Sequence, residues 1–527
     1  MQHLSRVLAT VTGLVLLLLL AGCNGGGEEE TATPTVPTTS ATLTATVPTI
    51  SVTPTATVPV RPTAIAARGV RIVVDSTADT NTRDDTVTLR EAIMLASGEL
   101  AAADLNSSEV NNVKGEPGPE SADTISFDPA VFPPDAPATI SLTATLPVLS
   151  TGGDAIVGAK AGVIVDGANL GFECFQIRSD GNAIKGLQIQ NCHTGIVLQT
   201  AARNNMIGGS AEGERNVISS NDAVGVRVDG SANVIQGNYI GTDASGTMSR
   251  PNEMEGIWIA PGAQENLVGG SNPGEGNVIS GNSLFGVSIS GLGAKGNLVK
   301  GNYIGVDASG RVALKDRYGV VLDSGAQNNI IGGSVPGDAN VISGNQSAGV
   351  LIRGSGTDDN SIIGNFIGTD SSGNERLGQG TGIWLLKGTQ GNIIGGTSDG
   401  EGNIIANSGI FGIIIESAET TGNTIRGNSI YSNERGSIVS RNGNIGLDPP
   451  IIDGVNPVQG TACANCIVDI YSDPGDEGKV YEGSTQADGD GRFIFDKAPS
   501  GPYVTATATD ANGNTSTFSK PFSVPTG

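Results

Sequence analysis

Acidic side chains are the first candidates for chemistry in this chain, since glycosidic bonds are usually cleaved by two carboxyl groups about 5 to 9.5 Å apart. A recurring Gly-(Ile/Val)-x-(Ile/Val/Leu) sequence places Asp229, Asp323 and Glu416 at equivalent positions of separate repeats. If repeats stack as neighbouring strands, roughly 4.8 Å apart, these carboxyls are separated by about 14 Å. That separation is too large for a hydrolytic pair. We expect Asp323 to form an ion pair with Arg353 of the next repeat.

Other residue types that could act in catalysis are few. His193 is the only histidine after the N-terminal segment, and no Gly-x-Ser-x-Gly sequence accompanies it, so a Ser-His-Asp mechanism has little support. Asp243, Asp307 and Asp370 recur in Asp-(Ala/Ser)-Ser-Gly, a sequence in which Asp typically shapes a turn. We therefore assign no catalytic residue.

Trp258 and Trp384, the only tryptophans, suit a different role. They occupy equivalent, outward-facing positions four repeats apart, or about 19 Å along a stack of strands. Exposed aromatic rings on a long sheet face are suited to stacking against sugar rings, and the neighbouring Arg227 and Asp229 complete a predicted ligand-binding set. The alternative is that a loop, a neighbouring domain or another chain covers this row.

The cysteines indicate an oxidising compartment. Cys463-Ala-Asn-Cys466 could be a redox or half-zinc motif, but no second Cys or His pair accompanies it, so a local disulfide is favoured. Cys174 and Cys192 either bridge neighbouring coils or remain reduced in the core. We expect no bound metal or cofactor.

Ca²⁺ is the one ion for which the sequence offers candidate ligands. Asp488 and Asp490 lie in Asp-Gly-Asp-Gly and could ligate it, although a complete loop with a distal Glu is absent. A plain hairpin turn is the favoured interpretation of this segment.

The N-terminal segment predicts export. Arg6 precedes an apolar run from Val7 to Leu20, which is shorter than the roughly 20 residues that a spanning helix needs. The run ends in Leu-Ala-Gly-Cys23, which resembles the bacterial lipobox, in which the cysteine is acylated and becomes the mature N-terminus. We therefore expect a signal peptide at 1–22, a lipid anchor at Cys23 that holds the protein at the cell membrane or surface, and a Thr/Pro-rich stalk at 23–66.

The charge balance limits the classes of partner. With 53 acidic and 29 basic residues the formal net charge is −24. Such a chain is unsuited to binding nucleic acid or an anionic membrane surface electrostatically. The lipid is therefore the expected link to the membrane, while a polysaccharide or another surface protein is the expected external partner.

Internal repeats determine the expected fold. Asn-x-(Ile/Val)-Gly-Gly begins at Asn205, Asn266, Asn329 and Asn392, and the Gly-(Ile/Val)-x-(Ile/Val/Leu) sequence recurs about twice as often, every 30 to 33 residues. Each such unit holds three short strands with apolar residues at alternate positions, too few to form a core alone. The sequence therefore predicts a right-handed parallel β-helix with three strands per coil. Recurring Asn residues would stack as amide ladders between coils.

The N-terminal part of the folded region predicts a cap. Thr88-Leu-Arg-Glu91 is a capping box that opens a helix, and strands are expected at 71–75, 124–127, 139–142 and 163–166. Thr88 to Ile93, together with the Asn-Tyr-Ile-Gly-Thr-Asp repeats, resembles bacterial surface proteins that have a CSLREA-type segment and pectin-lyase-like β-helix repeats. Val87-Thr88 replaces the Cys-Ser of that family, so the match of the cap is partial. The resemblance covers about residues 70 to 448 and implies the fold, because this superfamily includes lyases, hydrolases, epimerases and adhesins.

The C-terminal region has a different pattern. Strands expected at 467–471, 492–495 and 503–508 indicate a small β-sandwich, and the segment from Thr507 resembles bacterial Ig-like modules. The expected boundaries are 67–170 for the cap and first coils, 171–448 for the β-helix repeats and 449–527 for the sandwich.

These features together predict a surface lipoprotein that functions in adhesion or polysaccharide binding without catalysis. A polysaccharide lyase or hydrolase is the first alternative, and a purely architectural surface component is the second.

Overall fold

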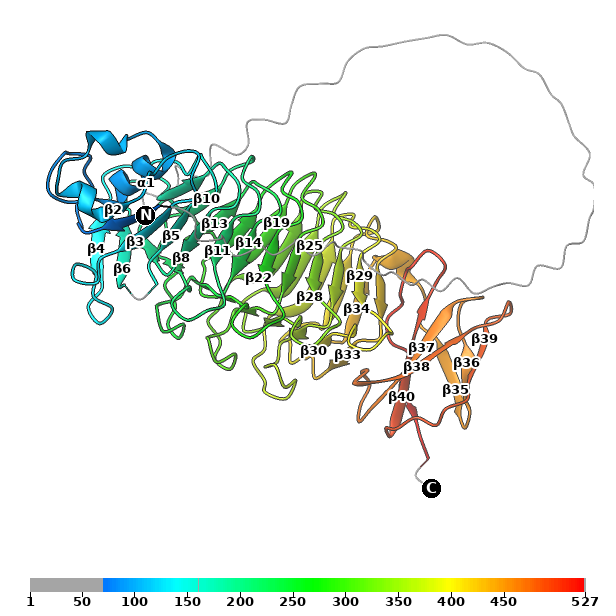
Figure 1. Ribbon diagram of the computed structural model, residues 1–527. Coiled ribbons are helices and arrows are strands. Elements are labelled where there is room, and N and C mark those ends of the chain that lie inside the picture. Colours follow the sequence, from blue (N-terminus) through cyan, green and yellow to red (C-terminus); the bar gives the residue numbers. More distant parts are fainter. Residues whose placement is uncertain (1–69, 160, 526–527) are drawn as a thin grey trace, which may run out of the picture. The chain divides into compact units, whose positions relative to one another are not determined.

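The structure is a computed structural model that describes residues 70–159 and 161–525 (Figure 1). The signal segment at 1–22, the acylation site Cys23 and the stalk at 23–66 lie outside the described residues. Within the described ranges, no helix has both the length and the apolar character needed to cross a membrane.

Three long parallel sheets, here called A, B and C, form the body of the protein. They contain 13, 11 and 10 strands, and the chain passes from A to B to C and back to A, so that each coil adds one strand to each sheet. In Figure 1 the strands of successive coils lie side by side along the column. The fold is the predicted right-handed parallel β-helix with three strands per coil.

The strands of the column are short, with two to six residues each. Sheet A contains β2 (Val113–Lys114), β1 (Arg71–Val74), β3 (Thr124–Phe127), β5 (Ala155–Val157), β8 (Ala183–Lys185), β11 (Met206–Gly208), β14 (Val234–Gln236), β17 (Leu267–Gly269), β20 (Leu298–Lys300), β23 (Ile330–Gly332), β26 (Ser361–Ile363), β29 (Ile393–Gly395) and β32 (Thr424–Arg426). Sheet B contains β4 (Ala138–Ser141), β6 (Val163–Asp166), β9 (Gln188–Gln190), β12 (Val217–Ser219), β15 (Tyr239–Ile240), β18 (Val278–Ile279), β21 (Tyr303–Ile304), β24 (Val341–Ile342), β27 (Phe366–Ile367), β30 (Ile404–Ala406) and β33 (Ser429–Tyr431). Sheet C contains β7 (Phe175–Ile177), β10 (Thr194–Leu198), β13 (Val224–Val228), β16 (Glu255–Ile259), β19 (Phe285–Ser290), β22 (Tyr318–Asp323), β25 (Ala348–Arg353), β28 (Thr381–Leu386), β31 (Ile413–Glu416) and β34 (Ile438–Arg441).

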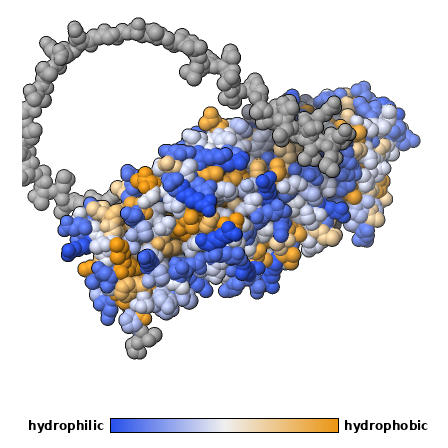
Figure 2. Space-filling view, turned by 180° about the vertical axis from the view of Figure 1, so that it is seen from behind, coloured by the Kyte–Doolittle hydropathy of each residue, from blue (hydrophilic) through white to orange (hydrophobic). Residues whose placement is uncertain are grey.

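Apolar residues at alternate strand positions fill the column. In one coil these are Ile235 of β14, Ile240 of β15 and Ile257 of β16, all fully buried. Glycine is required where the corners are tight: Gly269 has φ +89°, and a Cβ added there would lie 2.0 Å from the carbonyl oxygen of Lys300. Any larger residue would therefore push neighbouring coils apart. Figure 2, a view from behind, shows hydrophilic and apolar residues interspersed over the surface.

Amide ladders run along all three corners, as the recurring Asn residues predicted. In a typical rung, the backbone N and Nδ2 of Asn297 both donate to Oδ1 of Asn329, each at 3.0 Å. The first ladder comprises Asp123, Asp154, Asn182, Asn205, Asn233, Asn266, Asn297, Asn329, Asn360, Asn392, Asn423 and Asn444. The second comprises Asn216, Asn238, Asn277, Asn302, Asn340, Asn365, Asn403 and Asn428. These two ladders satisfy buried polar groups at corners where no strand pairing is available.

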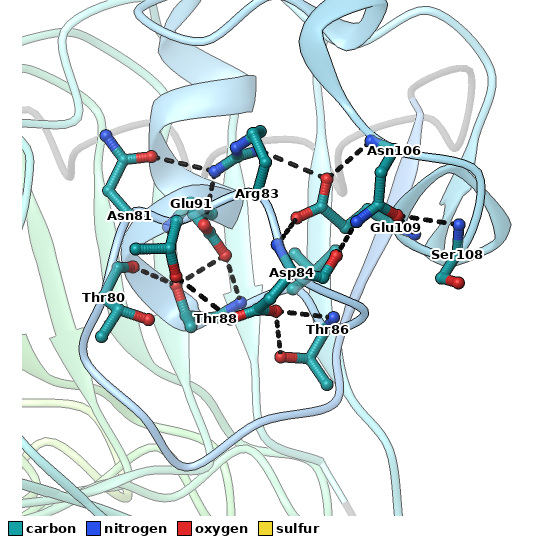
Figure 3. Close-up of polar contacts among 12 residues, drawn as sticks. Thr80, Asn81, Arg83, Asp84, Thr86, Thr88, Glu91, Asn106, Ser108 and Glu109 are labelled. Carbon is teal, nitrogen blue, oxygen red and sulfur yellow. Dashed lines mark hydrogen bonds and ion pairs between the residues drawn. The ribbon is translucent and has the colours of Figure 1, made fainter.

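The N-terminal cap is built around α1 (Leu89–Ser97), and the predicted capping box is present. The Thr88 hydroxyl accepts from the Glu91 backbone N, while Glu91 Oε2 accepts from the Thr88 backbone N (Figure 3). Arg83 contacts both Glu91 and Glu109, two buried carboxylates that approach it from α1 and from η2 (Glu109–Asn112) (Figure 3). η1 (Ala102–Asp104) is a further short turn of this region.

Arg90 attaches this cap to the first coils. Its Nε and Nη2 donate to Asp79 at 2.9 Å each, and its Nη1 donates to the Thr145 carbonyl at 2.9 Å. The Leu-Arg-Glu sequence of the cap therefore has a structural role here, because both of its charged residues are engaged in holding the cap together.

The C-terminal part is an antiparallel sandwich, as predicted. One sheet contains β35 (Ile451–Val455), β36 (Val458–Thr461) and β39 (Arg492–Phe495), and the other contains β38 (Val480–Gln486), β37 (Ile467–Asp473), β40 (Tyr503–Thr509) and β41 (Phe522–Ser523). η3 (Asn444–Gly446) precedes them. Arg426 of β32 donates to both oxygens of the buried Asp469 at 2.8 and 2.7 Å, which connects sheet A to the sandwich. Asp488 accepts from the backbone N of Asp490 and Arg492, the geometry of a plain turn.

Candidate binding face on sheet C

The outward side chains at the start of sheet C form two adjacent rows. Strand register aligns Gln176 of β7 with Val197 of β10, Arg227 of β13 and Trp258 of β16. Two positions further along the same coils are Arg178, Gln199 and Asp229. Their strands are consecutive neighbours in the sheet, so these side chains converge from separate coils.

A pocket of about 470 Å³ opens over these three coils. Arg178 Nε donates to Gln199 Oε1 at 2.9 Å, and Gln199 Nε2 donates to Gln176 Oε1 at 2.8 Å. Arg227 Nε contacts Asp229 Oδ1 at 2.9 Å. The lining therefore offers charged and amide groups to a polar ligand. It consists of Glu173, Gln176, Arg178, Val197, Gln199, Thr200, Ala201, Arg227 and Asp229.

Trp258 adjoins this pocket. The guanidinium carbon of Arg227 lies 5.0 Å from the centroid of its ring, a cation–π contact. The indole Nε1 donates to Ser290 Oγ of β19 at 2.8 Å, so the ring leans toward the next coil. Aromatic and hydrogen-bonding groups thus lie side by side at this end of the face.

The side chains between Trp258 and Trp384 do not form an open strip. Trp258 and Trp384 are only partly exposed, whereas Val321 and Leu351 between them are 0% and 2% exposed. Trp384 Nε1 donates to Glu416 Oε2 at 3.0 Å on the following strand. Trp384 is therefore separate from the pocket beside Trp258 rather than part of one open strip.

Of the pocket residues, only Arg227 and Asp229 were among the predicted site residues. Glu173, Gln176 and Arg178 come from a coil that the repeat alignment did not include. Their coil contains Cys-Phe-Gln-Ile in place of the Gly-Ile-x-Ile sequence by which the repeats were aligned. β7 nevertheless pairs in register with β10. The signal that could have found them is the apolar alternation of Phe175 and Ile177, one coil before the first glycine of the row.

Other sequence expectations are resolved by direct contacts. Arg353 Nη2 lies 2.6 Å from Asp323 Oδ2, which confirms the predicted ion pair. Asp307 confirms the predicted turn role: burial raises the pKa of its carboxyl, but hydrogen bonds from Ser309, Val312 and Arg311 outweigh burial, so the pKa is lowered. Among residues 70–159 and 161–525, no group of three or more His, Cys, Asp or Glu could hold a metal ion.

Both cysteine pairs form disulfides. Cys174 and Cys192, with Cα atoms 5.7 Å apart, link the segments before β7 and β10, which decides a question that the sequence left open. Cys463 and Cys466, with Cα atoms 5.4 Å apart, close a short loop in the sandwich. The first bridge joins the strand that contributes Gln176 to the strand that contributes Val197, so it braces the floor of the pocket.

Comparison with known proteins gives similarity in fold alone. No family model matches the chain, and no curated protein matches it. Among solved structures, pectate lyase Pel9A has a TM-score of 0.31 and 14% identity, over 69% of this chain and 79% of that one. An alginate lyase from Paenibacillus sp. has a TM-score of 0.27 and 14% identity, over 71% and 99%. A tailspike protein of E. coli bacteriophage HK620, in complex with a pentasaccharide, has a TM-score of 0.31 and 11% identity, over 76% and 77%. At these values the fold assignment rests on the strand pairing described above.

Proposed function

We propose that this chain is a surface lipoprotein that binds polysaccharide through the pocket at the start of sheet C and does not cleave it. The observation that carries the proposal is the juxtaposition of Arg178, Gln199 and Arg227 with the ring of Trp258. Sugars present hydroxyl groups at their edges and apolar C–H faces, so hydrogen-bonding side chains beside an aromatic ring match both.

From the predicted anchor and the flanking regions we infer that this pocket lies outside the cell. Cys23, in its lipobox sequence, would hold the chain at the membrane through a lipid. The CSLREA-type cap and the Ig-like module fit a bacterial surface protein. An adhesin that recognises a glycan on another cell is one form of this function.

The ion pair in the pocket supports binding over cleavage. Asp229 is held by Arg227, and Glu173 precedes β7, two coils away. The register also offsets the two residues by five positions along the strand, about 16 Å at roughly 3.3 Å per residue, so their backbones are well over 10 Å apart. Paired carboxyls of glycosidases lie up to about 9.5 Å apart. Because both carboxyls line one pocket, a polysaccharide hydrolase or lyase is the second candidate, and the experiment below separates the two.

The test uses the full-length chain against a panel of neutral and acidic polysaccharides. Arg178→Ala and Trp258→Ala should each weaken binding, by about 0.5 to 1.5 kcal/mol for the lost aromatic contact. Trp384→Ala is the matched control, because this tryptophan lies four strands from Trp258 in sheet C. Equal loss in the control, or binding unaffected by all three changes, would remove the pocket from the proposal. Reducing ends or unsaturated products released by the wild-type chain, and lost in Glu173→Gln or Asp229→Asn, would establish the enzyme instead.

The anchor has its own test. Cys23→Ser should abolish incorporation of a labelled fatty acid and release the protein from the membrane fraction. Equal labelling of the wild-type and variant chains would refute the lipid anchor while leaving the binding pocket untouched.

A further inference from the structure

The third amide ladder is interrupted in its middle. Hydrogen bonds link Asn221, Asn252, Asn282 and Asp316 in turn, and the ladder resumes where Ser408 donates to Asn433. The two positions in the gap are Asn345 and Gln379, which are 1% and 9% exposed. Neither Nδ2 of Asn345 nor either amide atom of Gln379 has a hydrogen-bond partner. Buried amide groups without partners are costly and uncommon, so they indicate a place where something else binds.

A pocket of about 460 Å³ opens at this gap. Asn345 and Gln379 line it together with the exposed basic residues Lys315 and Arg376. No ion pair of Lys315 is found among residues 70–159 and 161–525, and Arg376 contacts only the exposed Glu434, a pair that solvent weakens. The remaining lining residues carry no charge: Gly344, Gln346, Leu377, Gly378, Gly380, Asn407 and Gly409.

This combination is unusual in so acidic a chain. With a net charge of −24, most of the surface disfavours anions. Two carboxyl residues adjoin the basic pair in sequence: Asp316 is buried, which raises its pKa well above its usual value, and Glu375 is exposed to solvent. The pocket lining itself contains two basic residues and no acidic residue, with amide groups in its wall.

We propose that this pocket binds a hydroxylated carboxylic acid, with the carboxylate between Lys315 and Arg376 and hydroxyl groups at the amides of Asn345 and Gln379. A cation pair favours a carboxylate through charge-assisted hydrogen bonds. The amides each present a donor and an acceptor, and a hydroxyl group can satisfy both. Inorganic phosphate matches less well, because a largely deprotonated anion mainly accepts hydrogen bonds and would leave the oxygen of Gln379 unpaired.

The site is separate from the binding face on sheet C. Its residues lie in the segments that connect sheets B and C, next to β22, β25 and β28, whereas the other pocket lies over β7, β10 and β13. Failure of polysaccharide binding at sheet C would therefore leave this proposal standing, and the reverse also holds. A free sugar acid and an acidic residue within a glycan are two sources of the same ligand chemistry.

Calorimetric titration of the full-length chain tests the site. Gluconate and glucuronate should bind, while glucose, which has the hydroxyl groups without the carboxylate, and inorganic phosphate should bind at least tenfold more weakly. Lys315→Ala, and the double change of Lys315 and Arg376 to Ala, should raise the Kd for glucuronate about tenfold or more, as expected for losing a charge-assisted hydrogen bond. Lys295→Ala is the matched control, since Lys295 is an exposed lysine outside the pocket lining and should leave the Kd unchanged.

Several outcomes would overturn the assignment: no binding of either acid at millimolar concentration, equal binding of phosphate, or an unchanged Kd in Lys315→Ala. All three basic residues are exposed, so the variants are expected to fold, and thermal unfolding checks this. An oligosaccharide with a terminal glucuronate distinguishes the two sources. Tighter binding than the free acid would identify a glycan end as the ligand, and weaker binding would identify the free acid.

Discussion

The first and third amide ladders are built from the same residue type at equivalent corners of the coils, yet they differ in completeness. From Asp123 to Asn444 every rung of the first ladder is bonded to the next. The third is bonded as far as Asp316 and then leaves the amide of Gln379 without a partner. A complete ladder has a structural role only, because its polar groups are already hydrogen-bonded to one another. An interrupted ladder leaves buried donors and acceptors unpaired at the wall of a pocket. A ligand can bind such groups without any change in the β-helix.

Alanine substitution should produce the largest contrast between the two ladders. Asn297→Ala removes the Oδ1 that accepts from Asn266 N and Nδ2. The buried backbone N–H of Asn266 loses its partner, and Nδ2 keeps only its bond to the Gly230 carbonyl. We expect a loss of about 3 kcal/mol or more in the free energy of unfolding, because unpaired buried groups cost about 1–3 kcal/mol each. Asn345→Ala should cost about 1 kcal/mol or less, since its Nδ2 is already unpaired.

Urea unfolding followed by circular dichroism measures both variants. Gln346→Ala, at an exposed neighbour of Asn345, is the control for a side-chain truncation at this corner. Equal destabilisation by Asn297→Ala and Asn345→Ala would show that the third ladder is as complete as the first, and the distinction between them would fail.

A pH-dependent contrast should come from Asp316. Its Oδ2 faces Gly286 as Asn282 Nδ2 faces Gly256, so the oxygen takes the position of an amide nitrogen. Burial raises the pKa of this carboxyl well above its usual value, against hydrogen bonds from the backbone and side chain of Asn282. The folded state therefore holds a proton that the unfolded chain releases above a pKa of about 3.9. Stability should fall as pH rises from there toward the folded-state pKa.

Asp316→Asn should remove this dependence and stabilise the protein at neutral pH. Thermal unfolding of the wild-type and variant chains between pH 4 and pH 8 would show the two curves converging at the acidic end. A variant that is less stable than wild type at pH 7 would contradict a neutral Asp316.

The first ladder also contains a buried acidic residue, Asp154, from which we expect a smaller effect of pH on stability. Burial, together with the charge of the neighbouring Asp123, raises the pKa of Asp154 to about 6, against hydrogen bonds from Asp123 N and Thr151. Stability should therefore decrease between about pH 4 and pH 6, by on the order of 2–3 kcal/mol in total. Asp154→Asn should flatten this part of the profile, whereas Asp128→Asn, at a separate turn, should not. A wild-type profile that rises over this interval would contradict the raised pKa.

The regular features of the column could be predicted from sequence because they repeat. The Asn spacing predicted the ladders, alternation predicted the register that aligns Arg227 with Trp258, and Thr88 to Glu91 predicted the capping box. The pocket residues Glu173 and Arg178 could not be found by the same means, since their coil lacks the aligned glycine. The gap at Gln379 could not be predicted from the sequence for a different reason. Gln is also an amide, and only the structure shows that its amide atoms and those of Asn345 have no hydrogen-bond partner.

The smallest expected effect comes from repairing the third ladder. Gln379 occupies the position held by Asn252 and Asp316 in the preceding repeats, with one methylene more in its side chain. Gln379→Asn should place Oδ1 within reach of Asn345, as in the complete ladders, and raise the free energy of unfolding by about 1 kcal/mol. The same change should weaken glucuronate binding, because the amide would be engaged in the ladder. Gln346→Asn shortens another glutamine that lines the same pocket but lies outside the ladder, so it should not raise stability. Thermal unfolding and calorimetric titration of both variants measure the two effects. A Gln379→Asn chain that gains stability and still binds the acid with unchanged Kd would show that the gap in the ladder and the binding site are unrelated.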